Sequence, residues 1–542
     1  MKKNLPSFLS VILLLSVMVL KAENGKESKS PVPYKSPNSV LYGKDIVINN
    51  DPSQDQRNVH VSVAFNGWLF AVYTHNTSST AGLTILKSVD NGITWTVIDD
   101  NSNTGTYTAA GIVVAGNTLT DLKLFVAGIY EAASNDYRVW CDRYDAQTGA
   151  FENEFFSEQS SRTFYDVAIA SDYRYPASGI SPYSLGIIYS KAGTSSDSVI
   201  LLTSSDGGYT MGSREIVSAT DNYFRKVAIS YGICNSYSNG RYFAAWEEMD
   251  YNYSTMGHIW TAYTDPWIYS PIANKIKLDS LNTTYIDVCS NPTIATQFNN
   301  VDNSSGNLSE IVLFDGNWNP GNNDVLGSAN VQAVGTGNYY WQNFVIADSG
   351  DDEMQSDANF DPTDNNFLVT YFDSTSQKLP YLVNYMDLAD PGTWTIISNG
   401  YNDSSNLSNP YPKVQIDPIY TKVANVWSAE GTGGGVAMFD AEYSNYNGIS
   451  VNHKSDDAIL EGAYPNPAST RATIVFILNK QSEVAITLYS IVGQEIKLIT
   501  DQSFSQGRNS VNVDVSAMPE GTYIYSFKAD DFSASGRITV VR

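Results

Sequence analysis

The chain has 542 residues and a formal net charge of −25. This length allows one large domain and a second, smaller one. A strongly acidic surface repels the phosphates of nucleic acids, so we exclude a nucleic-acid partner. The 38 glycines and the 12% share of aromatic residues suit many short strands joined by turns, and amphipathic helical runs are scarce. The composition therefore predicts an all-β protein.

The N-terminus has the pattern of an export signal. Two lysines precede the apolar run Phe8–Leu20, and Ala22 is the small residue that a signal peptidase prefers. We predict a signal peptide over residues 1–22; a membrane anchor is the alternative, for which the run is short. No later apolar stretch reaches about 20 residues, so we expect no integral membrane span in the mature form. Residues 23–37 form a polar leader that cannot bury a core.

A strand-like motif recurs from Asp51 to about Tyr443 at intervals of about 50–65 residues, a period typical of a β-propeller or a solenoid. The motif openings are Val63, Val113, Val167 and Val227 and, more weakly, Pro292, Ala358 and Val414. Seven openings predict a β-propeller of seven blades, with six as the alternative because the fifth and sixth repeats are blurred. The last repeat ends after its third strand, and we expect the run Lys44–Ile48 to add an outer strand and close the ring.

The segment Ser88–Trp95 lies between two strand-like runs, and its Asp-Asn-Gly predicts a tight turn. The segment Ser204–Met211 repeats the pattern, with Met in place of Trp. The pattern S-x-D-x-G-x-T-W resembles the Asp-box of sialidase-type β-propellers, where it is a structural turn between the third and fourth strands of a blade. The resemblance implies a structural role for Ser88, Asp90, Gly92, Thr94, Trp95, Ser204, Asp206, Gly208 and Thr210.

Three arginines lie just before predicted inner strands, whose starts meet at one mouth of a propeller channel: Arg57, Arg162 and Arg225. Three guanidiniums would suit a carboxylate or sulfate on a sugar. The set resembles the sialidase site, in which an arginine triad grips the carboxylate, a Tyr activated by a Glu attacks, and an Asp is the acid/base. Tyr165 and Asp166, beside Arg162, are the candidates that this resemblance implies.

The chain departs from the sialidase pattern in two ways. No Phe-Arg-Ile-Pro precedes the first Asp-box, and no arginine occurs from Met249 to Ser469, where the last member of the triad is expected. The alternative interpretation is that the arginines pair with surface carboxylates.

A glycosidase of another propeller family needs only two carboxylates roughly 5–10 Å apart. The candidate acids at the predicted mouth are Glu247, Glu248, Asp250, Asp373 and Glu430, and among 57 Asp and Glu such a pair also arises by chance. Aromatic side chains near loops, such as Tyr251 and Trp260, could stack on sugar rings, although most aromatic residues of a β-protein belong to its core.

The run Asp348–Glu353 offers oxygen ligands for Ca²⁺, with Asp348, Asp351 and Asp352 as candidates. It lacks the spacing of an EF-hand loop, and a solvated acidic loop is the alternative. No other cofactor is expected. The three cysteines, Cys141, Cys234 and Cys289, are too few for a disulfide scaffold; one bridge between Cys234 and Cys289, or buried free thiols, are the two alternatives.

The last residues contain clustered landmarks separated by alternating runs that predict a small, immunoglobulin-like β-sandwich. The landmarks include Tyr464, Pro465, Asn466, Pro467, Gly521 and Tyr523. They resemble the type A sorting domain of the type IX secretion system of Bacteroidetes-like bacteria. The resemblance implies that the secretion machinery is a partner and that the chain is secreted or attached to the outer cell surface. A plain immunoglobulin-like adhesive module is the alternative.

We therefore predict a signal peptide (1–22), a polar leader (23–37), a β-propeller (38–448), a linker (449–457) and a sorting domain (458–542). Because the propeller lacks a complete catalytic set, the leading functional hypothesis is a non-catalytic module that binds a glycan or another extracellular polymer. The alternatives are a glycoside hydrolase of the sialidase-like superfamily and a cell-surface adhesin that binds protein.

Overall fold

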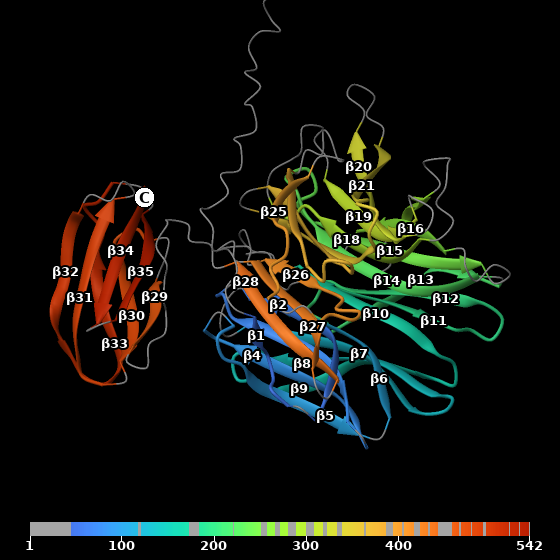
Figure 1. The fold of residues 1–542 in the computed structure, drawn as a ribbon, viewed down its shortest axis with the longest axis horizontal. Coiled ribbons are helices and arrows are strands. Elements are labelled where there is room, and N and C mark those ends of the chain that lie inside the picture. The colour runs from blue at the N-terminus through green and yellow to red at the C-terminus, as the bar shows by residue number, and fades with distance from the viewer. Residues whose placement is uncertain are drawn as a thin grey trace, which may run out of the picture. The chain divides into compact units, whose positions relative to one another are not determined.

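The computed structural model describes residues 45–540 with gaps, and the elements that it describes are β-strands (Figure 1). The gaps are residues 52, 65, 78, 91, 104, 117–120, 173–183, 221, 251–256, 266–271, 280–288, 300–307, 318–321, 333–338, 363–364, 386–393, 404–405, 417–422, 432–433, 443–457, 465–467, 479, 491–494, 520 and 530–531. Outside these gaps, no helix is long and apolar enough to cross a membrane. The predicted all-β class is confirmed. The expected signal peptide, leader and linker lie outside the described residues.

Six of the sheets described within residues 55–398 each consist of four strands that follow one another in the chain and pair antiparallel. The strands are β2 (Asp55–Val63), β3 (Leu69–Asn76), β4 (Ala81–Ser88) and β5 (Thr96–Asn103) in the first sheet; β6 (Thr106–Ala115), β7 (Lys123–Ala133), β8 (Asp136–Asp145) and β9 (Phe151–Ser160) in the second; β10 (Phe164–Ser171), β11 (Leu185–Lys191), β12 (Asp197–Ser204) and β13 (Gly212–Ala219) in the third; β14 (Asn222–Gly232), β15 (Arg241–Asp250), β16 (Gly257–Thr264) and β17 (Ala273–Lys277) in the fourth; β18 (Cys289–Thr296), β19 (Glu310–Gly316), β20 (Asp324–Gln332) and β21 (Tyr339–Ala347) in the fifth; and β22 (Glu353–Asp361), β23 (Asn366–Asp373), β24 (Tyr381–Tyr385) and β25 (Thr395–Ser398) in the sixth.

A seventh four-stranded sheet joins the two ends of this region. It contains β26 (Lys413–Ile416), β27 (Val423–Gly431), β28 (Gly434–Glu442) and, at its edge, β1 (Ile46–Val47). Ile46 lies opposite Phe439 and Val47 opposite Met438, so blue β1 lies beside orange β28 in Figure 1. The predicted addition of this N-terminal run to the last repeat is confirmed.

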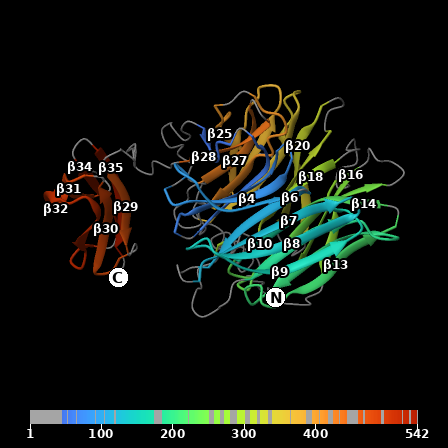
Figure 2. The same ribbon diagram turned by 90° about the horizontal axis from the view of Figure 1, so that it is seen from below.

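The first strands of the sheets pack against one another in chain order, from β2 through β6, β10, β14, β18 and β22 to β26, and β26 contacts β2 again. The sheets thus form a ring (Figure 2), which is the architecture of a β-propeller. The inner and middle strands are covered on both faces by neighbouring sheets, and for this reason β3 and β11 are almost continuously buried and begin with apolar runs.

Hydrophobic clusters fill the spaces between adjacent sheets. One cluster, for example, combines Phe70 and Leu83 of the first sheet with Ile112 and Val126 of the second. The three cysteines are buried in such clusters, and the bridge between Cys234 and Cys289 is not formed.

The two turns that the sequence singled out connect β4 to β5 and β12 to β13, which are third and fourth strands. In the first turn the Gly92 N–H donates to Ser88 Oγ at 2.9 Å, and the Thr94 N–H donates to Asp90 Oδ1 at 2.8 Å. The Trp95 indole N–H donates to the Gly92 carbonyl at 2.9 Å. The second turn repeats the Ser and Asp contacts, from Gly208 to Ser204 at 2.8 Å and from Thr210 to Asp206 at 2.8 Å. These side chains therefore hold the turns.

The C-terminal part consists of two sheets that share one core. One sheet has the order β29 (Ala458–Tyr464), β30 (Arg471–Leu478), β33 (Gly507–Asp514). The other has the order β32 (Glu495–Phe504), β31 (Ser482–Ser490), β34 (Gly521–Ala529), β35 (Phe532–Val540). Phe476 of β30 lies 4.9 Å from Phe527 of β34, ring centre to ring centre, within this core.

The landmarks of this C-terminal part lie at strand ends. Tyr464 ends β29 and Gly521 begins β34. Tyr523 is buried, and its hydroxyl donates to the Pro519 carbonyl at 2.9 Å. Residues 465–467, with Pro465, Asn466 and Pro467, lie outside the described residues.

Candidate functional site

A channel runs through the ring, and the first strands of all seven sheets line it. It contains a cavity of about 240 Å³. Residues near the start of the first strands line this cavity, among them Asp166 of β10, Lys226 of β14 and Asn291 of β18. The starts of the first strands are where the sequence predicted functional groups.

Backbone irregularities cluster at this end of the channel. In β2, β14, β18 and β22, a β-bulge near the start of the strand shifts the register of its pairing with the second strand. Asn58, Asn291 and Gln355, at three of these β-bulges, have φ values of 50°, 51° and 56°, and Tyr411, just before β26, has 44°. Positive φ is uncommon for Gln and Tyr. Such a backbone persists only where its surroundings hold it in place.

Buried acids hold these bulges through their backbone N–H groups. Glu247 Oε2 accepts the Asn291 N–H at 3.2 Å, and Asp315 Oδ1 accepts the Gln355 N–H at 2.7 Å. Asp315 Oδ2 also accepts from the Asn291 side-chain amide at 2.7 Å. Burial raises the pKa of Glu247 and raises that of Asp315 to about 7. The two acids therefore connect neighbouring sheets.

Asp166 makes a similar connection one sheet earlier. Its Oδ2 accepts the Val227 N–H at 3.1 Å, and its Oδ1 lies 3.8 Å from Lys226 Nζ. Asp166 also raises the pKa of Lys226. The Lys226 ammonium lies 6.0 Å from the ring centre of Tyr411, three sheets further along the ring. Groups from distant parts of the chain therefore meet at this mouth.

The other candidates of the fourth sheet are Glu248, Asp250, Tyr251 and Trp260. Glu248 accepts a hydrogen bond from the side-chain amide of Asn222, on the adjacent strand. Asp250 is the last residue of β15, opposite Asn222 in the strand pairing. Tyr251 lies outside the described residues. Trp260 is half-buried in β16 and stacks on another tryptophan at 6.4 Å between ring centres, so its ring contributes to the core.

Arg57 is bound at the seam where the first and last sheets meet. Its guanidinium donates to both carboxylate oxygens of Glu430, at 2.6 and 3.0 Å, and to Asp55 Oδ1 at 2.8 Å. Glu430 raises the pKa of Arg57. This pairing matches the alternative interpretation, in which an arginine of the predicted triad pairs with carboxylates.

Arg162, Tyr165, Asp197, Tyr223 and Arg225 form a second group, the Tyr165–Arg225 cluster. The Arg225 guanidinium lies 4.8 Å from the Tyr165 ring centre and 5.4 Å from the Tyr223 ring centre. The Tyr165 hydroxyl donates to Asp197 Oδ2 at 3.2 Å. Burial and then the Asp197 charge raise the pKa of Tyr165 to about 12. Burial also raises the pKa of Asp197, against the opposing charges of Arg225 and Arg162.

The structure thus brings Tyr165, Arg225 and Arg162 together around Asp197 and binds Arg57 elsewhere. Asp197, Lys226 and Asp315 were not among the residues predicted from the sequence. Asp197 begins the third strand of its sheet, far from Tyr165 in sequence, so only the antiparallel pairing brings the two together. Lys226 is adjacent to Arg225 and lies within β14, and its place directly before the motif opening at Val227 was the available signal.

No group of three or more His, Cys, Asp or Glu side chains is placed to hold a metal ion in the described part of the chain. That part includes Asp348, Asp351 and Asp352. Asp352 Oδ1 instead accepts the Asn323 N–H at 2.9 Å, and the Asp351 carbonyl accepts from the Asn322 side chain at 2.9 Å.

The C-terminal part matches a known family, over residues 462–541, described as the secretion system C-terminal sorting domain. A comparison with curated protein sequences gave no match.

Several solved structures are similar to the larger part of the chain. A Fusarium graminearum α-L-arabinofuranosidase is 11% identical with a TM-score of 0.41, covering 74% of this chain and 98% of that one. The polysaccharide lyase Uly1 is 10% identical with a TM-score of 0.42, covering 78% and 95%. The Trypanosoma rangeli sialidase is 10% identical with a TM-score of 0.38, covering 93% and 89%.

A sorting domain of this kind implies contact with the type IX secretion machinery and a place outside the outer membrane, either on the cell surface or in the medium. The ring of antiparallel sheets precedes it in the chain. The chain is therefore a β-propeller followed by a secretion-system sorting domain.

Proposed function

We propose that the protein is an extracellular binding module that holds a glycan at the Tyr165–Arg225 cluster without cleaving it. In this proposal the seven four-stranded sheets are the blades of the propeller, residues 1–22 are a cleaved signal peptide, and the C-terminal sheets form an immunoglobulin-like sandwich. The Ser88 and Ser204 turns are Asp-boxes.

The observation that carries this proposal is the exposed guanidinium of Arg225 between two tyrosine rings. Among the described residues, neither Arg162 nor Arg225 has a side-chain ion pair, in contrast to Arg57. Tyrosine faces stack on sugar rings, arginine donates to carboxylate or sulfate groups, and Asp197 can accept from hydroxyls. Acidic sugars are therefore the ligand class that suits this cluster.

Binding is favoured over cleavage because the acids near the mouth have structural partners. Glu247 and Asp166 accept backbone N–H groups of the next sheet, and Glu430 binds Arg57. A Tyr165 hydroxyl with a pKa of about 12 stays protonated at neutral pH, which disfavours its action as a nucleophile.

The test is an array of acidic and neutral glycans probed with the full mature chain, in which retained protein and released sugar are read from the same spots. Retention without release supports the proposal. Arg225→Ala should weaken binding to the retained glycans about tenfold or more, because a charge-assisted hydrogen bond is lost.

Arg143→Ala is the matched control, because Arg143 lies at the same distance, 4.8 Å, from the ring centre of Tyr209 in one of the two turns. Binding that is equally weakened by both substitutions, or by neither, would contradict the proposed site. Retention of no glycan would instead direct attention to protein partners.

A glycoside hydrolase is the second candidate, favoured by one observation. Tyr165 donates to a carboxylate, Asp197, beside an arginine, and this arrangement is similar to the tyrosine–acid pair of sialidases. Released sugar on the same array, lost in Tyr165→Phe, would replace the binding proposal with this one.

A further inference from the structure

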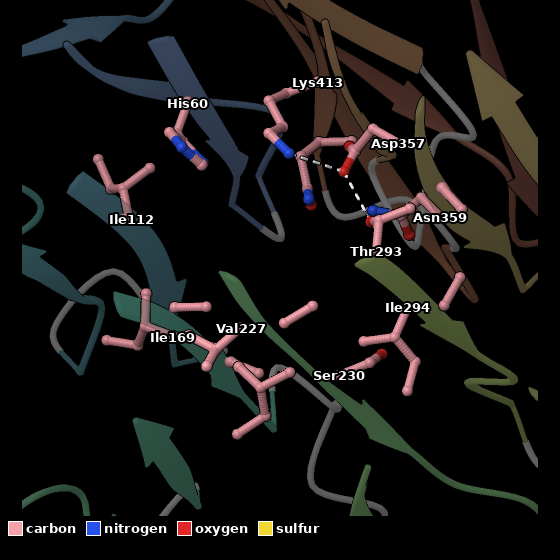
Figure 3. A pocket seen from close by; sticks show the side chains of 18 of the residues that line it. His60, Ile112, Ile169, Val227, Ser230, Thr293, Ile294, Asp357, Asn359 and Lys413 are labelled. Carbon is pink, nitrogen blue, oxygen red and sulfur yellow. Dashed lines mark hydrogen bonds and ion pairs between the residues drawn. The ribbon is translucent and has the colours of Figure 1, made fainter. Parts of the chain in front are cut away.

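The channel cavity has a polar side built from residues that follow the bulges. His60, Thr293, Asp357 and Lys413 line the cavity from the first, fifth, sixth and seventh sheets (Figure 3). His60, Thr293 and Asp357 are the residues at which regular strand pairing resumes after the β-bulge of their sheet. Lys413 is the first residue of β26. The ring closure therefore gathers four polar side chains that are far apart in sequence.

Asp357 occupies the centre of this polar side, and its own acceptors are used. Its Oδ1 accepts from Lys413 Nζ at 3.1 Å and from Thr293 Oγ1 at 3.0 Å, and its Oδ2 accepts the Val414 N–H at 2.9 Å. An ammonium has three donors. Lys413 therefore retains donor capacity beyond Asp357.

His60 is the group without a partner. No hydrogen bond or ion pair joins its ring to another of the described residues, and Figure 3 shows the ring facing the cavity. Burial and the charges of Lys413 and Lys226 lower its pKa to about 3, so the ring is neutral at physiological pH. A neutral imidazole offers one N–H donor and one acceptor. Lys413 and Lys226 line the cavity with their carboxylate partners Asp357 and Asp166, and the remaining ammonium donors of the two lysines can bind an anion.

The opposite side of the cavity carries several aliphatic side chains. Ile112, Ile169 and Val227 line it from the second, third and fourth sheets, together with the polar Ser230 (Figure 3). Ligand sites commonly combine such an apolar wall with a few polar groups. One side of the cavity can therefore bind a polar group of a ligand, and the other can contact its hydrocarbon part.

We propose that the channel binds a small organic carboxylate, with its carboxylate group against His60 and Lys413 and its hydrocarbon part against Ile112 and Ile169. The cavity of about 240 Å³ is far larger than the space that one water molecule needs. It therefore has room for a molecule of a few carbon atoms. This site is separate from the Tyr165–Arg225 cluster, so the glycan array does not test it.

Histidine signals provide a direct test. The chain has only four histidines, so isotope labelling of their ring carbons gives few NMR signals. The signal that disappears in His60→Gln belongs to His60. Titration of the full mature chain with acetate and with butyrate should move the His60 signal saturably. Each added methylene should tighten binding about threefold to fourfold, because apolar surface becomes buried.

Variants separate the proposal from a general salt effect. Lys413→Met should weaken butyrate binding at least about tenfold, because an ion pair with the ligand is lost. Since this change also removes a partner of Asp357, calorimetry with His60→Gln gives a second readout, with His258→Gln as the matched control. His258 is paired with Asp279 at 2.6 Å, outside the cavity lining, and its loss should leave butyrate binding unchanged.

Three results would overturn the proposal: a His60 signal that does not saturate, butyrate binding that is equal in the His60→Gln and His258→Gln variants, and equal effects of inorganic phosphate, acetate and butyrate. Saturable binding that strengthens with chain length and requires His60 would support it.

Discussion

Glu310 shows how a single buried carboxyl makes stability depend on pH. It is 1% exposed, accepts from Thr261 Oγ1 at 3.4 Å, and its pKa is raised by burial to about 8. In the unfolded chain the carboxyl ionises near its ordinary value of 4.5. Between these two values the folded state holds a proton that the unfolded state has lost. The free energy of unfolding therefore falls as pH rises through this window.

Glu310→Gln should remove this dependence. The wild-type chain is expected to lose about 1.4 kcal/mol of unfolding free energy per pH unit across the window from this group, and the variant should not. Denaturant unfolding at pH 5, 6 and 7 measures the difference in slope. Glu131→Gln, at the partly exposed end of β7, is the control and should keep the wild-type slope. Identical slopes in wild type and Glu310→Gln would refute the assignment.

Asp315 combines two hydrogen-bonded connections in one side chain. Replacing it with Ala leaves the Gln355 N–H and the Asn291 amide without this acceptor in a buried place. We expect Asp315→Ala to lower the free energy of unfolding by about 2 kcal/mol. Thermal and denaturant unfolding measure this loss.

Asp315→Asn tests the cause of that loss, since it keeps one carbonyl acceptor at the same position. It should cost clearly less than Asp315→Ala. An equal decrease in the free energy of unfolding for both variants would show that the hydrogen-bond acceptor at position 315 is not the source of the stability.

At the scale of elements, local patterns were predicted well and contacts between distant segments were not. The Ser88–Trp95 turn was predictable because Asp90 and Ser88 bind backbone groups within the same eight residues. The edge strand β1 was predictable because the last repeat lacked a fourth strand. Both predictions used only sequence periodicity and turn chemistry.

The site was only partly predictable because its partners are far apart in sequence. Arg57 was identified, but its partner Glu430 lies 373 positions away, so its pairing depended on the ring closure. Glu247 was identified as an acid, while its role in holding Asn291 depends on a bulge that a sequence pattern does not reveal. Asp197 reaches Tyr165 only through the strand pairing of its own sheet.

For the whole molecule, the pairing of β1 with β28 joins the two ends of the propeller. Besides the strand pairing, the Ala437 N–H donates to Gln56 Oε1 at 2.8 Å, and Ser428 Oγ donates to the Gln56 carbonyl at 2.5 Å. These contacts connect the first sheet to the last. The seam is therefore a combination of one short strand and buried polar contacts.

A chain that begins at Asn49 and lacks β1 tests the strand alone. We expect its melting temperature to fall by several degrees compared with a chain that begins at Asp45, because pairing is lost along the exposed edge of β28. An unpaired edge also promotes association between molecules. Thermal unfolding and analytical ultracentrifugation measure the two effects. Equal melting temperatures and a monomeric truncated chain would show that the buried polar contacts suffice.

The same pairing determines when the propeller can finish folding. The closing strand β1 lies at the start of the propeller, and its partner β28 lies at the end. The hydrogen-bonding edge of β1 therefore has no partner until Phe439 has been synthesised. Contacts of such long sequence separation form slowly. The ring therefore cannot close during synthesis of the residues that precede Phe439, which make up most of the chain, and it can close while the C-terminal part is still being made.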